Sequence, residues 1–298
     1  MEYKVQSNSV LSKKIVLLGS SGFIGKAIRR VLAQKGYKHV HPSSSMDCDL
    51  LDFQSIVCLL RKHSPDIVIG AYGLRREKLC NSGKGLVDYL SMSRFLFNAL
   101  LTRSGIRYIH VSSDCVRDPR NLRESLHAQY IKSRILSESS LLNTLASNSP
   151  PPTIIRPTIV YGHFSSDDPL RPISLLKSAM DDERIYIWGN GHEIRNYIHV
   201  DDLARYIESC IHIQTDEPFI TTAYNQSFAI SSILSSIANI TGRDLNIVYR
   251  KRTIPRFDFK PPNLIDKKLY ETNLHVWLSK AHSQLKSTCN SFLAGDFQ

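Results

Sequence analysis

Long apolar runs and paired metal-ligating residues are both absent from this sequence. No stretch approaches the ~20 apolar residues that a membrane-spanning helix needs, and the opening segment, MEYKVQSNSVLSKK, has no hydrophobic core for a signal peptide. The six cysteines include no CxxC pair, and the eleven histidines form no HExxH pattern. We therefore expect a cytoplasmic protein with reduced thiols, no membrane contact and no metal.

The composition that is present is typical of a globular protein. Of the 298 residues, 42% are hydrophobic and 22% are charged, which suffices for the core of one large domain or two modest ones. The net charge of +11 favours anionic partners such as phosphorylated small molecules, nucleic acid or an anionic membrane. Because the basic residues are spread along the chain, we expect a solvated positive face and no nucleic-acid partner.

Apolar runs alternate with amphipathic stretches through the first half of the chain. Strands are expected at 15–18, 38–42, 65–73, 106–114 and 153–162. Helices are expected from the first glycine loop to Gly36, and at 53–63, 90–105 and 130–147. This alternation predicts an α/β fold in which a doubly wound parallel (Rossmann) sheet carries helices on both faces.

The alternation loosens after Gly162, where loops rich in Pro, Asp and Ser appear. We predict a dinucleotide-binding domain over 1–162, to which 195–224 returns. A smaller, discontinuous C-terminal substrate-binding domain is expected from 163–194 and 225–298.

A glycine-rich loop, GSSGFIG, lies between the first expected strand and the first expected helix. Strand, glycine turn and helix in this order are typical of a dinucleotide-binding βαβ unit. The glycines allow a tight turn, close approach of a pyrophosphate and close helix packing, and the helix N-terminus offers N–H groups to the phosphates. The predicted cofactor contacts are Gly19, Gly22, Phe23, Ile24 and Gly25.

The end of the second expected strand bears on the choice of cofactor. A carboxylate there pairs with the ribose hydroxyls of NAD, but serines at 43–45 come before the nearest acid, Asp47. Hydroxyl groups near a 2′-phosphate, helped by Arg29 or Arg30, fit NADP better. We therefore predict NADP or NAD, with a preference for NADP and a contact from Ser43.

The stretch YIKSR has residue types and spacing suited to hydride transfer. A hydride moves to or from a carbon that bears oxygen only if a proton joins or leaves that oxygen. A phenol, with a pKa of ~10, needs a nearby cation for this task near neutral pH. Tyr130 and Arg134 share a helix face because they are four residues apart, and Ser113, at a strand end, can hydrogen-bond the reacting oxygen.

The motifs along nearly the whole chain resemble those of the extended short-chain dehydrogenase/reductase family, the NAD-dependent epimerase/dehydratase group that modifies nucleotide sugars. They include GSSGFIG, CDLLD, PDIVIGAYG, IRYIHVSSDCV, YIKSRILSE, IIRPTIVYGH and IWGNGHEIRNYIHVDDLA. The resemblance implies that Asp49 and Leu50 touch the adenine and that Ala71 lines the cofactor cleft. It further implies that Arg195 lies near the diphosphate of the nucleotide-sugar substrate, and that the protein is a homodimer.

The resemblance also implies a catalytic triad of Ser113, Tyr130 and a cation, from which this chain departs. Lysine is usual where Arg134 stands. Arginine keeps the charge, but its planar fork is longer and wider, so the exchange is not conservative at a fitted site.

The residues after Ser113 bear on the type of reaction. In the 4,6-dehydratases of the family the serine or threonine is followed by Asp-Glu, whereas Cys115 replaces the glutamate here. Cys115 falls where epimerase-reductases similar to GDP-fucose synthase carry a cysteine acid/base, although a structural cysteine filling a small pocket is equally compatible. The sequence thus predicts an NAD(P)-dependent nucleotide-sugar epimerase or 4-keto reductase. Because of Arg134, a cofactor-binding regulatory or scaffold protein on the same fold is the alternative.

Overall fold

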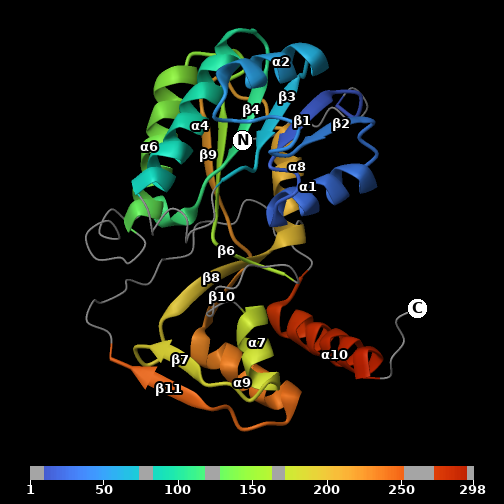
Figure 1. Ribbon diagram of the computed structural model, residues 1–298, viewed down its shortest axis with the longest axis vertical. Helices are drawn as coiled ribbons and strands as arrows, with labels where there is room; N and C mark the ends of the chain where they lie inside the picture. Colours follow the sequence, from blue (N-terminus) through green and yellow to red (C-terminus); the bar gives the residue numbers. More distant parts are fainter. Residues whose placement is uncertain (1–9, 74–82, 118–127, 163–171, 252–271, 294–298) are drawn as a thin grey trace. The chain divides into compact units, whose positions relative to one another are not determined.

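The computed structural model describes residues 10–73, 83–117, 128–162, 172–251 and 272–293, with side chains as far as residue 286 (Figure 1). The chain divides into two compact units. One consists of Met1–Thr158 and Leu203–Ala223, and the other of Ile159–Asp202 and Tyr224–Gln298.

The first unit is built on a parallel sheet of six strands in the order β2-β1-β3-β4-β5-β9. The strands are β1 (Lys14–Leu18), β2 (His39–Ser43), β3 (Ile67–Gly70), β4 (Arg107–Val111), β5 (Thr153–Pro157) and β9 (Phe219–Ala223). The central strands β1, β3 and β4 are almost wholly buried, as strands covered on both faces must be. The predicted α/β fold is confirmed.

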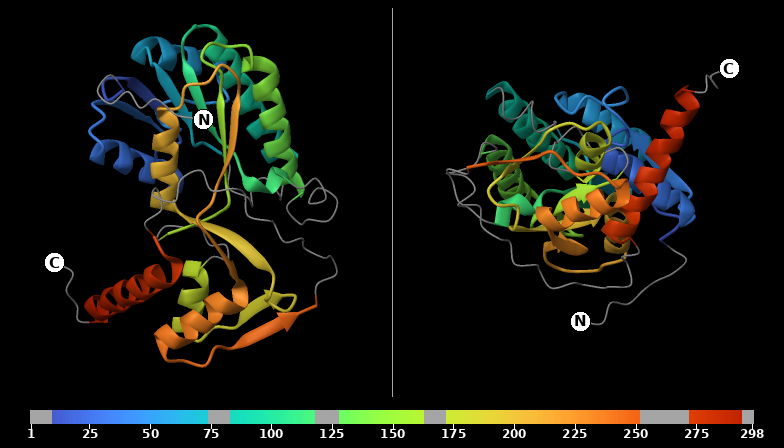
Figure 2. Two further views of the ribbon diagram at one scale, coloured as in Figure 1. Left: turned by 180° about the vertical axis from the view of Figure 1, so that it is seen from behind. Right: turned by 90° about the horizontal axis from the view of Figure 1, so that it is seen from below.

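Helices cover both faces of this sheet. They are α1 (Phe23–Gln34), α2 (Phe53–His63), α4 (Gly83–Leu101), α6 (Ala128–Leu145) and α8 (Val200–Ile211), with a 3₁₀ turn, η1 (Asp114–Arg117). Figures 1 and 2 show α2, α4 and α6 together on one face, with α1 and α8 on the other. Because β3 and β4 are neighbours in the sheet, the helices that follow them, α4 and α6, pack side by side.

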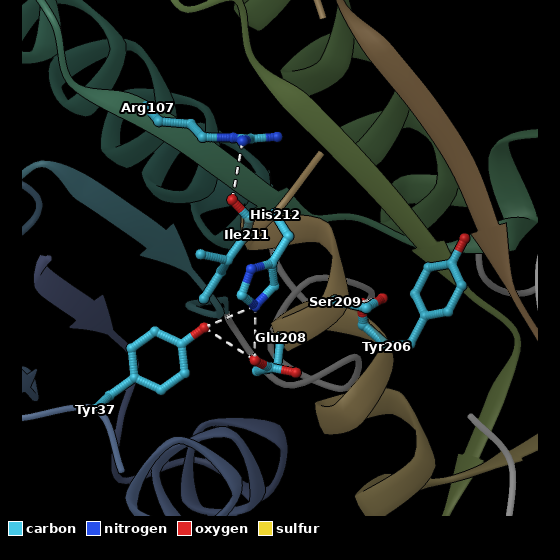
Figure 3. A network of polar contacts seen from close by, with 7 residues as sticks. All are labelled: Tyr37, Arg107, Tyr206, Glu208, Ser209, Ile211 and His212. Carbon is cyan, nitrogen blue, oxygen red and sulfur yellow. Dashed lines mark hydrogen bonds and ion pairs between the residues drawn. The ribbon is translucent and has the colours of Figure 1, made fainter. Parts of the chain in front are cut away.

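A polar network joins α1 to α8 (Figure 3). The hydroxyl of Tyr37, just after α1, donates to Glu208 at 2.9 Å and contacts Nε2 of His212 at 3.1 Å. Burial raises the pKa of Glu208, but hydrogen bonds from His212 and Tyr37 outweigh it and leave the pKa below its ordinary value. Arg107 of β4 donates to the carbonyl of Ile211 at 3.0 Å, at the C-terminal end of α8.

The second unit contains two small sheets. Its strands are β6 (Ile159–Tyr161), β7 (Ile185–Trp188), β8 (Ile194–His199), β10 (Gln226–Ala229) and β11 (Ile247–Arg250). Its helices are α7 (Pro172–Met180), α9 (Ile230–Thr241) and α10 (Leu274–Leu293). The sheets run β10-β8-β6 and β11-β7, and an apolar cluster from the three helices and both sheets forms the core of this unit.

Two expected elements differ from the structure. The single strand expected at 153–162 is wrong, because Thr158 turns its N–H and Oγ1 to the carbonyl of Ala223 (3.1 and 3.3 Å) and ends the pairing of β5. The following β6 pairs with β8 instead. Residues 195–199 were expected to return to the main sheet, but they form part of β8 between β10 and β6, and the first unit resumes only at Leu203.

Candidate active site

The glycine loop between β1 and α1 depends on two close backbone contacts. Gly19 has a φ of +76°, and a Cβ there would lie 2.6 Å from the carbonyl oxygen of Ala71. A Cβ on Gly25 would lie 2.1 Å from the carbonyl oxygen of Gly19. Gly22 is the N-cap of α1, where no side chain caps the helix and no acid stands in the first turn. The loop therefore offers backbone N–H groups and a positive helix end, which fit a dinucleotide pyrophosphate.

The segments beside this loop also contain predicted cofactor contacts. Ala71 directly follows β3, and its N–H donates to Leu18 of β1 at 3.0 Å. Leu50 packs on the core of the first unit, while the exposed Asp49 accepts a hydrogen bond from the N–H of Leu51 at 2.9 Å. Phe23 and Ile24 open α1 and are half-buried.

The end of β2 combines a serine and an acid. The carbonyl of Ser43 accepts hydrogen bonds from the N–H groups of Gly19 and Ser20 (3.0 and 3.1 Å), but its hydroxyl is buried and has no partner among the described residues. Asp47 folds back on Ser44 and accepts from its N–H and hydroxyl, both at 2.8 Å. These bonds hold the pKa of Asp47 below its ordinary value. An exposed carboxylate therefore lies close to the serines at the end of β2, from which a preference for NADP was predicted.

The ends of β4 and α6 bring the predicted catalytic residues into the same unit. Ser113 follows β4 directly, and Cys115 lies in η1. Tyr130 and Arg134 lie one turn apart on α6, with the guanidinium carbon of Arg134 5.0 Å from the centroid of the Tyr130 ring. The η1 turn, which contains Cys115, packs against α6. The helix that carries Tyr130 and Arg134 is thus a neighbour of the turn that carries the cysteine.

Arg134 is a buried cation. Only 7% of it is exposed, and no carboxylate of the described residues pairs with it. Its Nη1 donates to the hydroxyl of Tyr89 at 2.6 Å, its guanidinium carbon lies 4.5 Å from the centroid of that ring, and its Nε has no partner among the described residues. Burial lowers the pKa of Arg134, but interactions with Tyr89, Tyr130 and Cys115 outweigh burial and raise the pKa above its usual value.

A set of buried hydroxyl groups lies beneath Arg134. Ser137 donates to Ser93 at 3.0 Å, and the hydroxyl of Tyr72 donates to Ser93 at 3.2 Å. Farther into the core, Tyr108 and His110 are in hydrogen-bond contact at 3.1 Å. Burial, with a smaller effect from Arg134, lowers the pKa of His110 to about 3, so its imidazole is neutral at physiological pH.

Glu138 connects α6 with β5 through an ion pair and with the end of β4 through a hydrogen bond. Glu138 of α6 accepts a 2.5 Å hydrogen bond from Ser112, the residue before Ser113. Arg156 of β5 donates to both carboxylate oxygens of Glu138, with contacts from 2.5 to 3.2 Å. Since Glu138 lies one turn after Arg134, this pair sets the position of α6 against the strand end that presents Ser113.

Arg195 belongs to the second unit. It lies on β8, is 5% exposed, and its guanidinium contacts Glu193 at 3.4 Å and the carbonyl of Ile194 at 3.2 Å.

Several residues of interest were not predicted from the sequence. Tyr89 and Glu138 gave no local signal, because their partners are distant in the sequence. Tyr186 and Trp188 of β7 are 39% and 45% exposed, and the guanidinium carbon of Arg250 lies 3.9 Å from the Tyr186 ring centroid. Alternation of buried and exposed positions in IYIW is the pattern that could have indicated this exposed aromatic face.

Comparison with known proteins settles the family. Residues 15–216 match the NAD dependent epimerase/dehydratase family. The protein belongs to this family. The match covers more than half of the chain and confirms the resemblance drawn from the motifs.

Relatives and solved structures agree with this assignment. The chain is 26% identical to GDP-L-colitose synthase of Yersinia pseudotuberculosis over 311 residues, which covers 94% of this chain and 98% of the relative. It is 21% identical to GDP-L-fucose synthase of Azorhizobium caulinodans over 261 residues, with coverage of 80% and 83%. The structure of MoeE5 in complex with UDP-glucose and NAD shares the fold, with a TM-score of 0.75 at 18% identity and coverage of 93% and 99%.

None of the described helices is long and apolar enough to cross a membrane. Within the described residues, no group of three or more His, Cys, Asp and Glu side chains is placed to hold a metal ion.

Proposed function

We propose that the protein is an NAD(P)-dependent epimerase or 4-keto reductase acting on a GDP-linked sugar, with Ser113, Tyr130, Arg134 and Cys115 as catalytic residues. The observation that carries the proposal is the buried guanidinium of Arg134 beside Tyr130. Burying a cation is costly, and no carboxylate of the described residues pairs with this one. A negative charge that develops next to Arg134 during the reaction would offset that cost. The names of the two relatives support the choice of a GDP-sugar.

In this proposal NAD(P), when bound at the glycine loop, supplies or accepts the hydride. Tyr130 gives its phenolic proton to the oxygen of the sugar carbonyl during reduction and takes it back in the reverse direction. Arg134 stabilises the negative charge left on Tyr130, and Ser113 donates a hydrogen bond to the reacting oxygen. Arg195 would contact the nucleotide diphosphate, to which a guanidinium can donate two parallel hydrogen bonds.

Cys115 is assigned the second proton transfer, which epimerisation requires. Inverting a carbon next to a carbonyl means that a proton leaves one face and another joins the opposite face. Cys115 lies in η1 two residues after Ser113, and the packing of η1 against α6 supports a place at the same site. In a pure reductase Cys115→Ser would leave turnover intact, so this substitution separates the two reactions.

Cofactor preference and oligomeric state belong to the same proposal. Serines at the end of β2 favour NADP, whereas the carboxylate of Asp47, held by Ser44, opposes a 2′-phosphate nearby. We keep NADP as the preferred cofactor, with NAD as the alternative. A homodimer is proposed from the family resemblance, and a mass measurement of the native protein tests it.

The alternative is that the protein binds the cofactor as a regulatory or scaffold protein without catalysis. The arginine at position 134, where lysine is usual, is the feature that supports this alternative. Tyr130→Phe decides between the two functions. Turnover of a GDP-linked 4-keto sugar, followed by the absorbance of reduced cofactor, should fall by ~10²–10⁴-fold, the usual contribution of a general acid. Cofactor affinity of the same variant is the control and should be retained. Unchanged turnover would refute the catalytic role, and a wild-type protein that binds cofactor without turnover would favour the regulatory function.

A further inference from the structure

The side chain of Tyr89, on α4, is the direct support of Arg134. It is fully buried, and it contacts the guanidinium in two ways. Its hydroxyl accepts the 2.6 Å hydrogen bond from Nη1, and its ring centroid lies 4.5 Å from the guanidinium carbon. The hydrogen bond fixes one nitrogen of the guanidinium, and the ring contact restricts the orientation of the guanidinium plane. Together they leave the guanidinium of Arg134 little freedom to move.

The helices that carry Tyr89 and Arg134, α4 and α6, are also joined next to this pair. Burial raises the pKa of Tyr89, which keeps the phenol neutral, while Arg134 acts in the opposite direction. Ser137 is three residues after Arg134 on α6, and Ser93 is four residues after Tyr89 on α4. The Ser137–Ser93 hydrogen bond, at 3.0 Å, therefore joins the same two helices that carry Tyr89 and Arg134.

The backbone after β3 also makes room for an arginine. A Cβ on Gly73 would lie 2.8 Å from Nη2 of Arg134, so a larger residue there would displace the guanidinium. A lysine ammonium is compact and has no second nitrogen to place beside Gly73. The surroundings thus match the size and planarity of a guanidinium on both sides, with Tyr89 bonded to one terminal nitrogen and Gly73 beside the other.

We propose that Tyr89 is a positioning residue that keeps Arg134 against Tyr130, and that Tyr89 and Arg134 act as a pair in place of a single lysine. This inference rests on the proposed function and deepens it. If the pair acts as a unit, loss of the Tyr89 hydroxyl matters when residue 134 is arginine and has little effect when residue 134 is lysine.

A double-mutant cycle tests the pairing. Tyr89→Phe, Arg134→Lys and the double variant are compared with the wild-type protein for kcat and KM of the GDP-sugar. Hydrogen bonds to charged groups contribute ~1.5–3 kcal/mol, so Tyr89→Phe should lower kcat by about tenfold or more with little change in KM. In the Arg134→Lys protein the same substitution should change kcat by less than about twofold. Equal losses in the two backgrounds would overturn the proposal.

Tyr108→Phe is the matched control for a purely structural effect. Tyr108 is as buried as Tyr89, and its hydroxyl contacts His110 instead of Arg134. Both variants should lose some thermal stability. Only Tyr89→Phe should move the pH–rate profile to higher pH, because a guanidinium that is no longer fixed gives less support to the negative charge on Tyr130. A similar shift in Tyr108→Phe would show that any disturbance of this core affects the site, and the proposal would fail.

Cofactor affinity of the same four proteins, measured by fluorescence titration of NADPH, separates this proposal from the proposed function. If the wild-type protein shows no turnover, the proposed reaction is refuted. If Tyr89→Phe then still weakens NADPH binding only when residue 134 is arginine, the pairing is supported. Additive effects on both turnover and affinity would refute the pairing, whatever the reaction is.

Discussion

Glu138→Gln should destabilise the first unit and displace α6, the helix that carries Tyr130 and Arg134. The substitution keeps the size of the side chain and removes its charge. Arg156 then loses the partner of its two-pronged interaction, and Ser112 loses a charged acceptor. Glu138 is 6% exposed and Arg156 is 23% exposed in their side chains, so the charge left behind is only partly reached by water.

The magnitude follows from this burial. Removing one partner of a fully buried pair costs ~3–5 kcal/mol. Since part of the Arg156 side chain regains water, we expect a loss of ~2–3 kcal/mol in the free energy of unfolding. For a unit of this size that corresponds to a decrease of ~5–10 °C in Tm. Turnover should fall as well, because the Glu138 pair connects α6 to the strand end that carries Ser113.

Urea unfolding at neutral pH measures the loss, and two further proteins sharpen the result. Asp88→Asn removes the acid of an exposed i,i+4 pair with Lys84, whose side chain is 79% exposed, and should change stability by less than ~0.5 kcal/mol. Glu138→Gln combined with Arg156→Met leaves no lone charge and should recover part of the loss. A Glu138→Gln protein as stable as the Asp88→Asn protein would refute the reasoning.

Three further predictions concern the glycine loop, the cofactor and a buried acid. Gly22→Leu should abolish cofactor binding with the fold retained, whereas Gly25→Ala should destabilise the fold, because its Cβ would lie 2.1 Å from a backbone oxygen; cofactor titration and thermal melting distinguish the two. Asp47→Ala should raise the affinity for NADP relative to NAD by removing a carboxylate near the 2′-phosphate, and an unchanged ratio in competition titrations would contradict this. Burial raises the pKa of Asp114 from 3.8 to about 6 against the opposing effect of Arg117, so the folded state binds more protons than the unfolded state in this window. Stability should therefore fall as the pH rises from about 4 to about 6, and Asp114→Asn should flatten that part of the curve in urea unfolding; an equal slope in both proteins would contradict it.

The sequence by itself determined the elements whose signal is local. The helix expected at 53–63 is α2 with the same bounds, and β1, the glycine loop and α1 follow in the expected order. Such elements are readable because hydrophobic periodicity and glycine conformation depend on neighbours a few residues away. Gly19 and Gly25 were selected for the same reason, and the structure supplies the contacts that require them. Spacing alone also placed Tyr130 and Arg134 on one helix face.

Only the tertiary structure decided what surrounds that helix face. Tyr89 meets Arg134 because β3 and β4 are neighbours in the sheet, which lays α4 against α6 across 45 residues of sequence. Glu138 meets Arg156 by the same kind of packing, and the continuous apolar run at 153–162 hides a break at Thr158 that depends on Ala223. No local pattern encodes these contacts, since each partner is chosen by strand order and helix packing. The buried arginine thus contacts a tyrosine that only the folded chain brings to it.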